Sequence, residues 1–336
     1  MSDAVREQTE RDEQVKRESG RRTRRSFLAA AAAVAGGYGV YQILDKANGG
    51  RLMPRPLRNA VFRFDAEVSK AVFHDRGLSP TYPVSRAVPL RTNGDYGLKD
   101  GIAPENYRLQ VAGVAEAHHF PQYMRDVTAW DYKFAAIPTD EPGVEAGTKE
   151  APKAPMPAAF AAAFAALKQQ QGDKRPRGRE EAGESDTALD PGTPGLLLTL
   201  EDVTKLPHHE LVTEFKCIEG WSQIVQWGGV RLADFIEAYP PERNEKGELP
   251  KYVSMETPDG DYYCGFDMRV CQHPQSLLVT EMGGQPLTRL HGAPLRLHMP
   301  IKYGYKQIKR IGRIVYTNEM PDDYWAKLGY DWDAGL

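Results

Sequence analysis

A cysteine at the end of a predicted strand is the residue best placed to carry chemistry. Leu211, Thr213, Phe215 and Cys217 fall on one face by period-two alternation, and Gly220 breaks the strand soon afterwards. A thiol in that position presents its sulfur to a cleft, and its thiolate form is a good ligand for a soft metal. The alternative is a buried structural thiol, because cysteine is among the residues most often buried.

The residues that follow Cys217 are expected to surround any site built on it. Glu219 and Trp221 are candidate catalytic residues, because both lie within a few positions of the sulfur and could line a substrate pocket. Glu219 has an alternative role, in which its carboxylate caps backbone amides of the turn. An aromatic-rich loop is predicted to continue from Gly220 to Gly228.

Positive charge gathers in the stretch from His291 to Arg313, which contains no Asp or Glu. Its lysines and arginines are Arg296, Lys302, Lys306, Lys309, Arg310 and Arg313. Glycines in the same stretch would let backbone N–H groups approach an anion. Arginine can grip a phosphate with two hydrogen bonds, and lysine acts on it as a point charge. The stretch therefore predicts an anion-binding cradle, with a solvated basic face as the alternative.

The two stretches together resemble the motifs of the sulfite-oxidase-type molybdopterin enzymes, most closely the periplasmic protein-methionine-sulfoxide reductase catalytic subunit. The first motif is Cys-Ile-Glu-Gly-Trp-Ser at 217–222, followed by Trp-Gly-Gly-Val at 227–230. The second is His-Gly-Ala-Pro-Leu-Arg-Leu at 291–297, followed by Lys-Tyr-Gly-Tyr-Lys-Gln-Ile-Lys at 302–309. Two separated motifs in the right order are a stronger signal than either alone.

This resemblance implies a fold and a cofactor. The expected fold class is α+β, a mostly β sulfite-oxidase-like molybdopterin-binding fold with short helices. Cys217 would ligate molybdenum, whose other ligands come from the pyranopterin dithiolene of molybdopterin and from oxo or water groups. The cofactor contacts that the resemblance carries over by position are Asn93, Thr257, His291, Arg296, Gln307, Ile308 and Lys309.

The expected activity is two-electron oxygen-atom transfer, and the residues after Cys217 indicate its direction. Sulfite oxidases usually follow the metal cysteine with an arginine-bearing loop that binds the anionic substrate, whereas Glu219 would repel sulfite. The resemblance therefore implies reduction of a sulfoxide or a similar X=O group, on a small molecule or on a protein. A sulfite oxidase/dehydrogenase-like enzyme and a non-catalytic envelope binding module are the alternatives. Electrons are expected from a separate partner, a membrane haem protein or cytochrome, because no C-x-x-C-H or flavin motif is present.

The N-terminal stretch 1–44 is predicted to be a twin-arginine export signal or an uncleaved membrane anchor. Residues 1–25 hold eight Lys/Arg and six Asp/Glu, and Arg24 and Arg25 precede Ser-Phe-Leu and a mild apolar run. The twin-arginine machinery carries folded proteins, which suits a cofactor assembled in the cytoplasm. The expected location is the periplasm or the outer face of the cell membrane.

The length of the rest allows one large domain or two ordinary ones, and the resemblance implies a single molybdopterin-binding oxidoreductase domain at 45–336. The 336-residue chain is 41% hydrophobic, enough for a substantial core, and its net charge of −3 implies no bulk attraction to nucleic acid. A flexible insertion is predicted at about 115–195. It contains an alanine-rich helix candidate at 158–171, and surface loops are expected at 140–155 and 172–194 because their composition cannot offset the entropy of ordering.

Short elements are expected on either side of this insertion. An extended arm is predicted for 51–107, and a helix begins at Leu232 because apolar residues recur there at i, i+3, i+4 and i+7. Strands are predicted at 107–114, 252–257, 262–264, 277–280, 295–299 and 311–317. The aromatic tail after Pro321 is expected to pack as a closing lid. Cys264 and Cys271 could form a disulfide or remain core thiols.

Overall fold

The computed structural model describes residues 60, 62–64, 66–69, 77–92, 94–98, 101–134, 182, 185 and 189–336. The predicted export segment at 1–44, the alanine-rich helix at 158–171 and the predicted loop at 140–155 lie outside these residues. None of the helices in the described ranges is long and apolar enough to cross a membrane.

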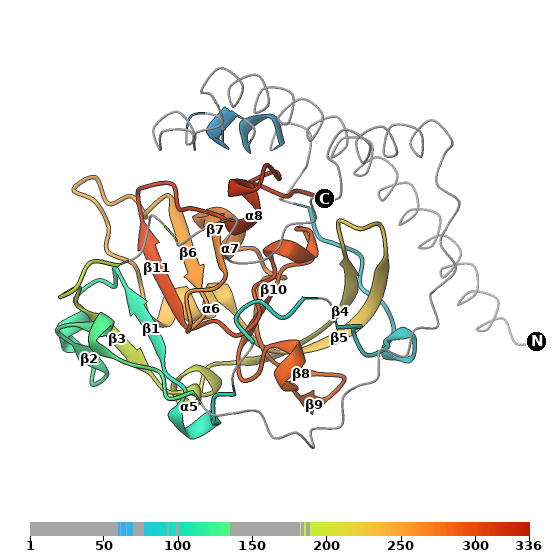
Figure 1. The fold of residues 1–336 in the computed structure, drawn as a ribbon, viewed down its shortest axis with the longest axis horizontal. Coiled ribbons are helices and arrows are strands. Elements are labelled where there is room, and N and C mark those ends of the chain that lie inside the picture. Colours follow the sequence, from blue (N-terminus) through green and yellow to red (C-terminus); the bar gives the residue numbers. More distant parts are fainter. Residues whose placement is uncertain are drawn as a thin grey trace, which may run out of the picture.

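Two β-sheets form the framework, and Figure 1 shows them side by side with short helices at their edges. One sheet has six strands in the order β2-β3-β1-β11-β6-β7, and the other runs β10-β8-β5-β4, with β9 paired to β8. The only parallel pairing between these described strands is β1 with β11. The predicted α+β class, mostly β with short helices, is confirmed.

The strands have the following bounds: β1 Leu109–Ala112, β2 Tyr123–Met124, β3 Gly195–Leu198, β4 His208–Lys216, β5 Ser222–Arg231, β6 Tyr252–Glu256, β7 Tyr263–Asp267, β8 Leu277–Met282, β9 Gln285–Pro286, β10 Arg296–His298 and β11 Arg313–Thr317. The α-helices are α5 Leu200–Thr204, α6 Leu232–Ala238, α7 Met268–Cys271 and α8 Tyr324–Lys327. The described residues also form six 3₁₀ turns: η1 Val84–Arg86, η2 Pro104–Asn106, η3 Ala117–His119, η4 Val127–Ala129, η5 Arg289–His291 and η6 Gly304–Lys306.

The predicted helix after the cysteine stretch is α6, and it buries the expected face. Leu232, Phe235 and Ile236 are buried in the main hydrophobic core, which also takes residues from both sheets. The helix ends before Pro240, which has no N–H to continue it. The periodicity predicted this element correctly because one apolar face meets one core.

The hairpin β4–β5 corrects one prediction and positions the cysteine. Residues 222–231 form a strand rather than an aromatic-rich loop, because Val225 and Trp227 alternate inward and residues 222–230 each pair with β4. The turn lies between the strands, where the Cys217 N–H donates to the Trp221 carbonyl (2.9 Å). Gly220 closes it with a φ of +89°, a conformation that other residues rarely adopt.

Segments before the hairpin run along it in extended form, as predicted for the arm, but residues 62–64 and 66–69 of the predicted arm 51–107 are helical. The Tyr82 N–H donates to the Val212 carbonyl of β4, and the Val88 N–H donates to the Ile224 carbonyl of β5. The surface-loop prediction for 172–194 is wrong at Ala182, which is buried in the main core. One methyl group in a charged tract is too weak a signal to predict that burial.

Cys264 and Cys271 are free thiols buried in the main core, so the disulfide alternative is wrong. Cys264 lies on β7, and its Sγ is 3.7 Å from the Tyr305 carbonyl oxygen. Burial raises the pKa of both thiols, with nearby Asp323 adding to the effect at Cys264 and Asp267 adding to it at Cys271. Both cysteines therefore act as small core residues.

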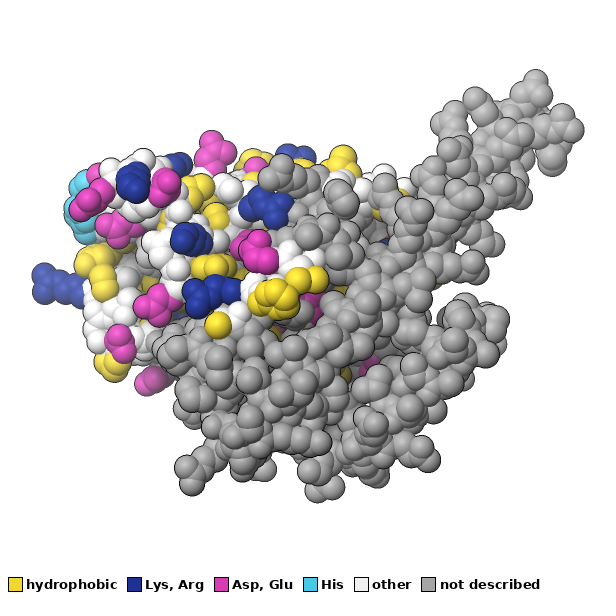
Figure 2. Space-filling model, turned by 90° about the horizontal axis from the view of Figure 1, so that it is seen from above, with side chains coloured by type: hydrophobic (Ala, Val, Ile, Leu, Met, Phe, Trp, Pro, Cys, Tyr) yellow, Lys and Arg dark blue, Asp and Glu magenta, His cyan; other side chains and the backbone are white. Residues whose placement is uncertain are grey.

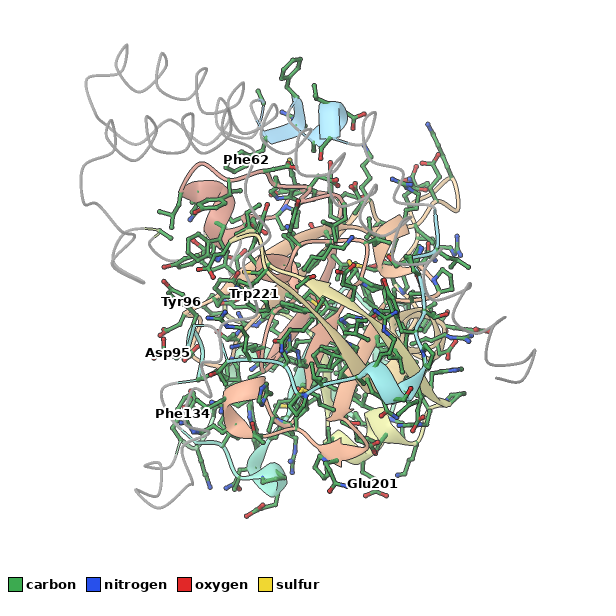
Figure 3. The ribbon with its side chains drawn as sticks, turned by 90° about the vertical axis from the view of Figure 1, so that its right-hand side faces the viewer. Phe62, Asp95, Tyr96, Phe134, Glu201 and Trp221 are labelled. Atoms are coloured by element: carbon green, nitrogen blue, oxygen red, sulfur yellow. The ribbon has the colours of Figure 1, made fainter. Side chains whose placement is uncertain are left out.

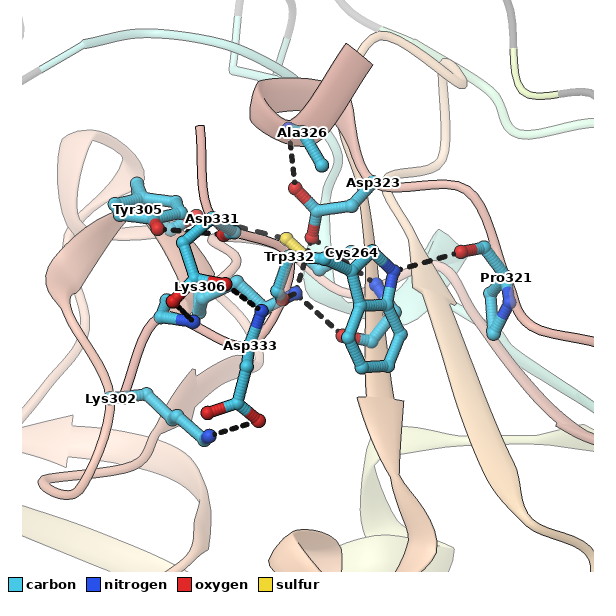
Figure 4. Close-up of polar contacts among 12 residues, drawn as sticks. Cys264, Lys302, Tyr305, Lys306, Pro321, Asp323, Ala326, Asp331, Trp332 and Asp333 are labelled. Carbon is cyan, nitrogen blue, oxygen red and sulfur yellow. Dashed lines mark hydrogen bonds and ion pairs between the residues drawn. The ribbon is translucent and has the colours of Figure 1, made fainter. Parts of the chain in front are cut away.

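The C-terminal tail is held by buried ion pairs, which Figure 4 shows. Lys306 Nζ lies 2.5 Å from Asp323 and also donates to the Trp332 carbonyl (2.8 Å), while Lys302 Nζ lies 2.7 Å from Asp333. Both pairs are almost fully buried. The tail thus packs against the basic stretch, as the lid prediction expected, and its aspartates neutralise two of that stretch's lysines.

This pairing corrects the predicted anion cradle. Lys302 and Lys306 already have carboxylate partners, and Arg313 pairs with Glu256 at 3.0 Å. The prediction missed these acids because Asp323 and Asp333 lie well beyond the basic stretch in sequence. Elsewhere, the described part of the face in Figure 2 mixes basic and acidic side chains, so no single-sign patch gathers there.

We predict that Lys306→Met lowers the free energy of unfolding by about 3–5 kcal/mol, because it leaves a buried carboxylate without its cation. Chemical denaturation measures the loss. The matched control is Lys205→Met, which breaks the exposed pair with Glu201 (3.1 Å) and should cost less than about 1 kcal/mol. Equal losses in the two variants would show that the buried pair does not anchor the tail.

Candidate functional site

A cavity of about 340 Å³ lies beside Cys217. This cysteine belongs to the turn between β4 and β5. Six separate stretches of chain form its walls: the arm near Tyr96, the β4–β5 turn, Tyr262, Arg296 of β10, the loop 304–309 and the tail. Figure 3 shows Tyr96 and Trp221 on the same side of the molecule. The Cys217 side chain is 8% exposed, so its sulfur is sheltered yet borders an open space.

Glu219 and Trp221 both line the cavity, where the sequence placed them. The Trp221 indole N–H donates to Glu219 Oε2 (3.0 Å), and its ring stacks on Phe215 with centroids 5.8 Å apart. The Arg91 guanidinium lies 4.8 Å from the centre of the same ring. These contacts hold Trp221 at the edge of the site with a carboxylate and a guanidinium beside it.

Arg296 is the most deeply buried charged residue on the cavity wall, at 1% exposure. Within the described residues its guanidinium hydrogen-bonds only to backbone carbonyls, the shortest at 3.1 Å to His291, and it lies 4.9 Å from the Trp227 ring centre. Burial lowers the pKa of Arg296 to about 9. A buried cation held mainly by carbonyls is poised for an anion.

Lys309 brings a second positive charge to the same cavity. Its Nζ donates to the Gly94 carbonyl oxygen (2.9 Å). Burial, and then repulsion by Arg296, lower the pKa of Lys309 to about 7, although Asp95 opposes the shift. A bound anion would restore the protonated form, because it would favour the charged side chain.

Gln307 lines the cavity, but its side chain is already engaged within the protein. His298 Nδ1 donates to its Oε1 (2.8 Å), and its amide group donates to the carbonyls of Met299 and Lys302. His298 Nε2 then accepts from the Thr213 hydroxyl (2.7 Å), which fixes the tautomer. Burial lowers the pKa of His298 to about 3, so the ring is neutral.

Three other predicted contacts lie behind the cavity wall rather than on it. Thr257 donates its hydroxyl to Asp259 (2.6 Å), and Ile308 is buried in the main core. His291 donates to the Leu90 carbonyl (2.7 Å), and burial lowers its pKa. These residues can support wall residues, but the structure does not bring their side chains to the cavity. Asn93 lies outside the described residues.

The sequence prediction missed an aromatic wall. Its rings are those of Tyr96, Tyr262, Tyr305, Trp325 and Tyr330. The tail aromatics were expected to pack, yet nothing in their spacing pointed to a common cavity with Cys217. Arg91 was also missed, since it lies in an arm with no regular pattern.

The residues present fit a thiolate-ligated metal held by an anionic organic cofactor. No group of three or more His, Cys, Asp or Glu side chains in the described ranges could hold a metal ion by itself. Cys217 therefore offers a soft ligand to a metal whose other ligands come from elsewhere. Arg296 supplies the buried countercharge that an anionic cofactor needs.

Comparison with known proteins matches part of the chain to a molybdopterin-binding family. The family described as oxidoreductase molybdopterin binding domain matches residues 192–325, which include Cys217, Arg296 and Lys309. This part of the chain is thus similar to a molybdopterin-binding oxidoreductase domain, as its motifs predicted.

Among individual relatives, a putative protein-methionine-sulfoxide reductase subunit YedZ1 of Azospira oryzae is 38% identical over 137 residues, 41% of this chain and 50% of the relative. The protein-methionine-sulfoxide reductase catalytic subunit MsrP of Campylobacter jejuni is 36% identical over 39% of this chain and 48% of its own. The chain thus matches half or less of the length of these relatives. The crystal structure of the sulfane dehydrogenase SoxCD from Paracoccus pantotrophus aligns with a TM-score of 0.34 and 18% identity, over 38% of this chain and 36% of that one.

The lowered pKa of Lys309 predicts a pH dependence of stability in cofactor-free protein. The ordinary lysine pKa is 10.5, so between about pH 7 and 10.5 the unfolded chain binds more protons than the folded protein. The contribution of Lys309 to the free energy of unfolding should therefore rise with pH across that window. Urea denaturation at several pH values measures it. Lys309→Met should flatten the rise, whereas the exposed Lys205→Met should not; identical pH profiles for all three proteins would contradict the assignment.

Proposed function

We propose that the protein is a molybdenum–molybdopterin oxidoreductase that reduces a sulfoxide by two-electron oxygen-atom transfer in the cell envelope. The observation that carries the proposal is the pairing of Cys217 with buried Arg296 on the walls of one cavity. The names of the relatives support the choice of a sulfoxide as substrate. The same names support the assignment as an enzyme over a binding module.

The overall reaction takes R₂S=O, two electrons and two protons to R₂S and water. The bound cofactor supplies the two-electron chemistry at the oxygen atom. Cys217 holds the metal through its sulfur, while Arg296 and Lys309 bind the anionic part of the cofactor. Tyr330 stays protonated at neutral pH, because burial raises its pKa, with Glu219 and Cys217 adding to the effect. Its hydroxyl is thus available as a hydrogen-bond donor.

One observation favours the sulfite alternative. Arg91 lies on the cavity wall beside Trp221 and supplies a cation that the residues after Cys217 lack. Glu219 lies on the same wall and would offset that charge for an anionic substrate. Parallel assays of sulfoxide reduction with an artificial electron donor and of sulfite oxidation with an artificial acceptor separate the two. Turnover of sulfite alone would establish the alternative, and turnover of neither substrate by cofactor-loaded protein would favour a binding module.

Cys217→Ser should abolish oxygen-atom transfer per bound molybdenum while keeping much of the pterin, because a hydroxyl cannot replace a soft thiolate. Arg296→Ala should instead lower cofactor occupancy and leave the loaded fraction active. Metal-to-protein ratio, pterin content and activity per molybdenum distinguish the two effects. The matched control is Cys271→Ala, which removes a core thiol outside the cavity.

The contrary outcome is clear. If Cys217→Ser turns over normally per molybdenum, the cysteine is only a core thiol and the assignment fails. If Arg296→Ala retains full occupancy, the buried guanidinium does not hold the cofactor.

Location and electron supply are part of the same proposal. The twin-arginine pair Arg24–Arg25 would direct folded, cofactor-loaded protein to the periplasm or the outer face of the membrane. A separate membrane haem protein or cytochrome would then deliver the electrons. The proposal for this partner rests on the chain having no haem or flavin motif.

Replacing both Arg24 and Arg25 with lysine should leave the protein folded in the cytoplasm, because the export machinery reads the arginine pair. Cell fractionation with immunodetection measures the location. The chain offers a matched control, because Arg21 and Arg22 form a second pair whose replacement should not matter. Normal export of the Arg24/Arg25 variant, or equal retention of both variants, would exclude the twin-arginine signal at this position.

A further inference from the structure

The tail contributes an uncharged aromatic surface to the cavity that contains Cys217. Trp325 lies in α8 and Tyr330 follows that helix, and both rings are half-buried and border the cavity. Tyr96 from the arm borders it as well. The basic residues Arg296 and Lys309 come from other segments, so the cavity combines charged and aromatic surfaces.

Contacts between the rings fix this surface. Trp325 meets Tyr330 edge-on at a centroid distance of 5.1 Å and meets Tyr96 edge-on at 6.0 Å. Tyr330 in turn contacts Tyr305 at 5.7 Å. Edge-to-face pairs at these distances are favourable beyond the area they bury. The rings therefore form a preformed surface rather than side chains that must reorganise to meet a ligand.

Buried polar contacts anchor the helix that carries Trp325. Asp323 caps α8 by accepting from the Ala326 N–H (3.1 Å), and the other oxygen of the same carboxylate pairs with Lys306. Lys306 lies in the loop 304–309, of which Gly304, Tyr305, Gln307 and Lys309 line the cavity. The position of Trp325 relative to that loop is thus set by a buried ion pair two residues away.

This surface suits a neutral sulfur compound. Aromatic edges and faces contact sulfur and alkyl groups favourably, by about 0.3–1.5 kcal/mol for each sulfur–aromatic contact. They offer nothing comparable to a small oxyanion such as sulfite, which needs cationic donors. A sulfoxide carries apolar substituents that can pack on the rings while its oxygen points elsewhere in the cavity.

We propose that Trp325 and Tyr330 form a specificity-determining wall that binds the apolar groups attached to the sulfur of a sulfoxide. The inference rests on the proposed function and adds to it the residues that select among sulfoxides, in favour of methyl sulfoxides with a second substituent larger than methyl. Dimethyl sulfoxide fills less of the wall and is a poorer substrate. Free and peptide-linked methionine sulfoxide share the chemistry that the wall recognises.

The test uses the cofactor-loaded enzyme with methyl phenyl sulfoxide, dimethyl sulfoxide and trimethylamine N-oxide. Trp325→Leu should raise KM for methyl phenyl sulfoxide by about 2- to 10-fold, as expected for losing one sulfur–aromatic contact, with kcat little changed. Trp325→Phe should restore most of the affinity, because it keeps an aromatic ring. KM for the N-oxide, which has no sulfur, should change less.

A matched control is Trp130→Leu, which removes a half-buried tryptophan that does not line the cavity. It should leave all three KM values unchanged. Free methionine sulfoxide and a short peptide containing it form a further comparison. Equal increases in KM for the free and the peptide-linked compound in Trp325→Leu support contact between Trp325 and the methionine sulfoxide side chain. An increase confined to the peptide would contradict that contact.

Two results would contradict the proposed role of Trp325 in the specificity-determining wall. A fall in molybdenum and pterin content in folded Trp325→Leu would show that the ring faces the cofactor. Equal increases in KM for all three compounds would show that it has no selectivity for sulfur substituents.

A binding measurement separates this inference from the proposed function. Methyl phenyl sulfide, the product of the reaction, should bind the loaded enzyme and lose about 2- to 10-fold in affinity in Trp325→Leu, as followed by competition or tryptophan fluorescence. If the enzyme reduces no sulfoxide yet binds the sulfide in this Trp325-dependent way, the function fails and the wall stands. If the enzyme reduces sulfoxides but its affinity for the sulfide is the same in Trp325→Leu, the proposed wall is contradicted and the proposed function is not.

Discussion

The burial of the Arg296 guanidinium is the constraint on which the site depends. Moving a cation out of water costs several kcal/mol unless an opposite charge or strong hydrogen bonds replace the water. Lys302 and Lys306 meet that requirement with aspartates from the tail. Arg296 meets it with carbonyl oxygens and an indole face among the described residues, and its pKa falls to about 9. That difference is the physical argument for an anion in the cavity, because an anion would compensate the charge that the fold leaves under-compensated.

The tail connects this electrostatic requirement to the shape of the site. Its aspartates neutralise the lysines that would otherwise compete with Arg296 and Lys309 for an anion. The pair between Lys306 and Asp323 holds the start of α8 against the loop 304–309, so Trp325 and Tyr330 line the same cavity as the basic residues. One set of contacts thus decides both where positive charge remains and where aromatic surface is presented.

The sequence predicted the parts of the site that depend on local pattern. Cys217 lies where period-two alternation ends, and α6 follows from apolar residues spaced for one helical face. Arg296 and Lys309 were expected from a run of basic residues, and both line the cavity. The elements that carry these residues are short, so the neighbouring residues in the sequence contain most of the information needed to predict them.

The rest depends on contacts that are distant in sequence. Lys306 forms an ion pair with Asp323, and Gln307 accepts a hydrogen bond from His298. Neither side chain therefore offers its polar atoms to a cofactor in the way that the motif suggested. Arg91 reaches the cavity from an irregular arm, whose path is set by hydrogen bonds to β4 and β5. Period and composition contain no information about such partners. Likewise, residues 222–231 form β5 because residues 222–230 pair with β4, although the aromatic content of this stretch favoured a loop.

The central claim is that the Cys217 sulfur binds molybdenum in a cavity whose buried cations hold an anionic cofactor. Molybdenum K-edge X-ray absorption on the loaded protein tests it most directly, because it counts sulfur neighbours of the metal independently of turnover. The account predicts one fewer sulfur neighbour in Cys217→Ser than in the unmodified protein, with the dithiolene sulfurs retained. The same number of sulfur neighbours in both proteins would contradict it.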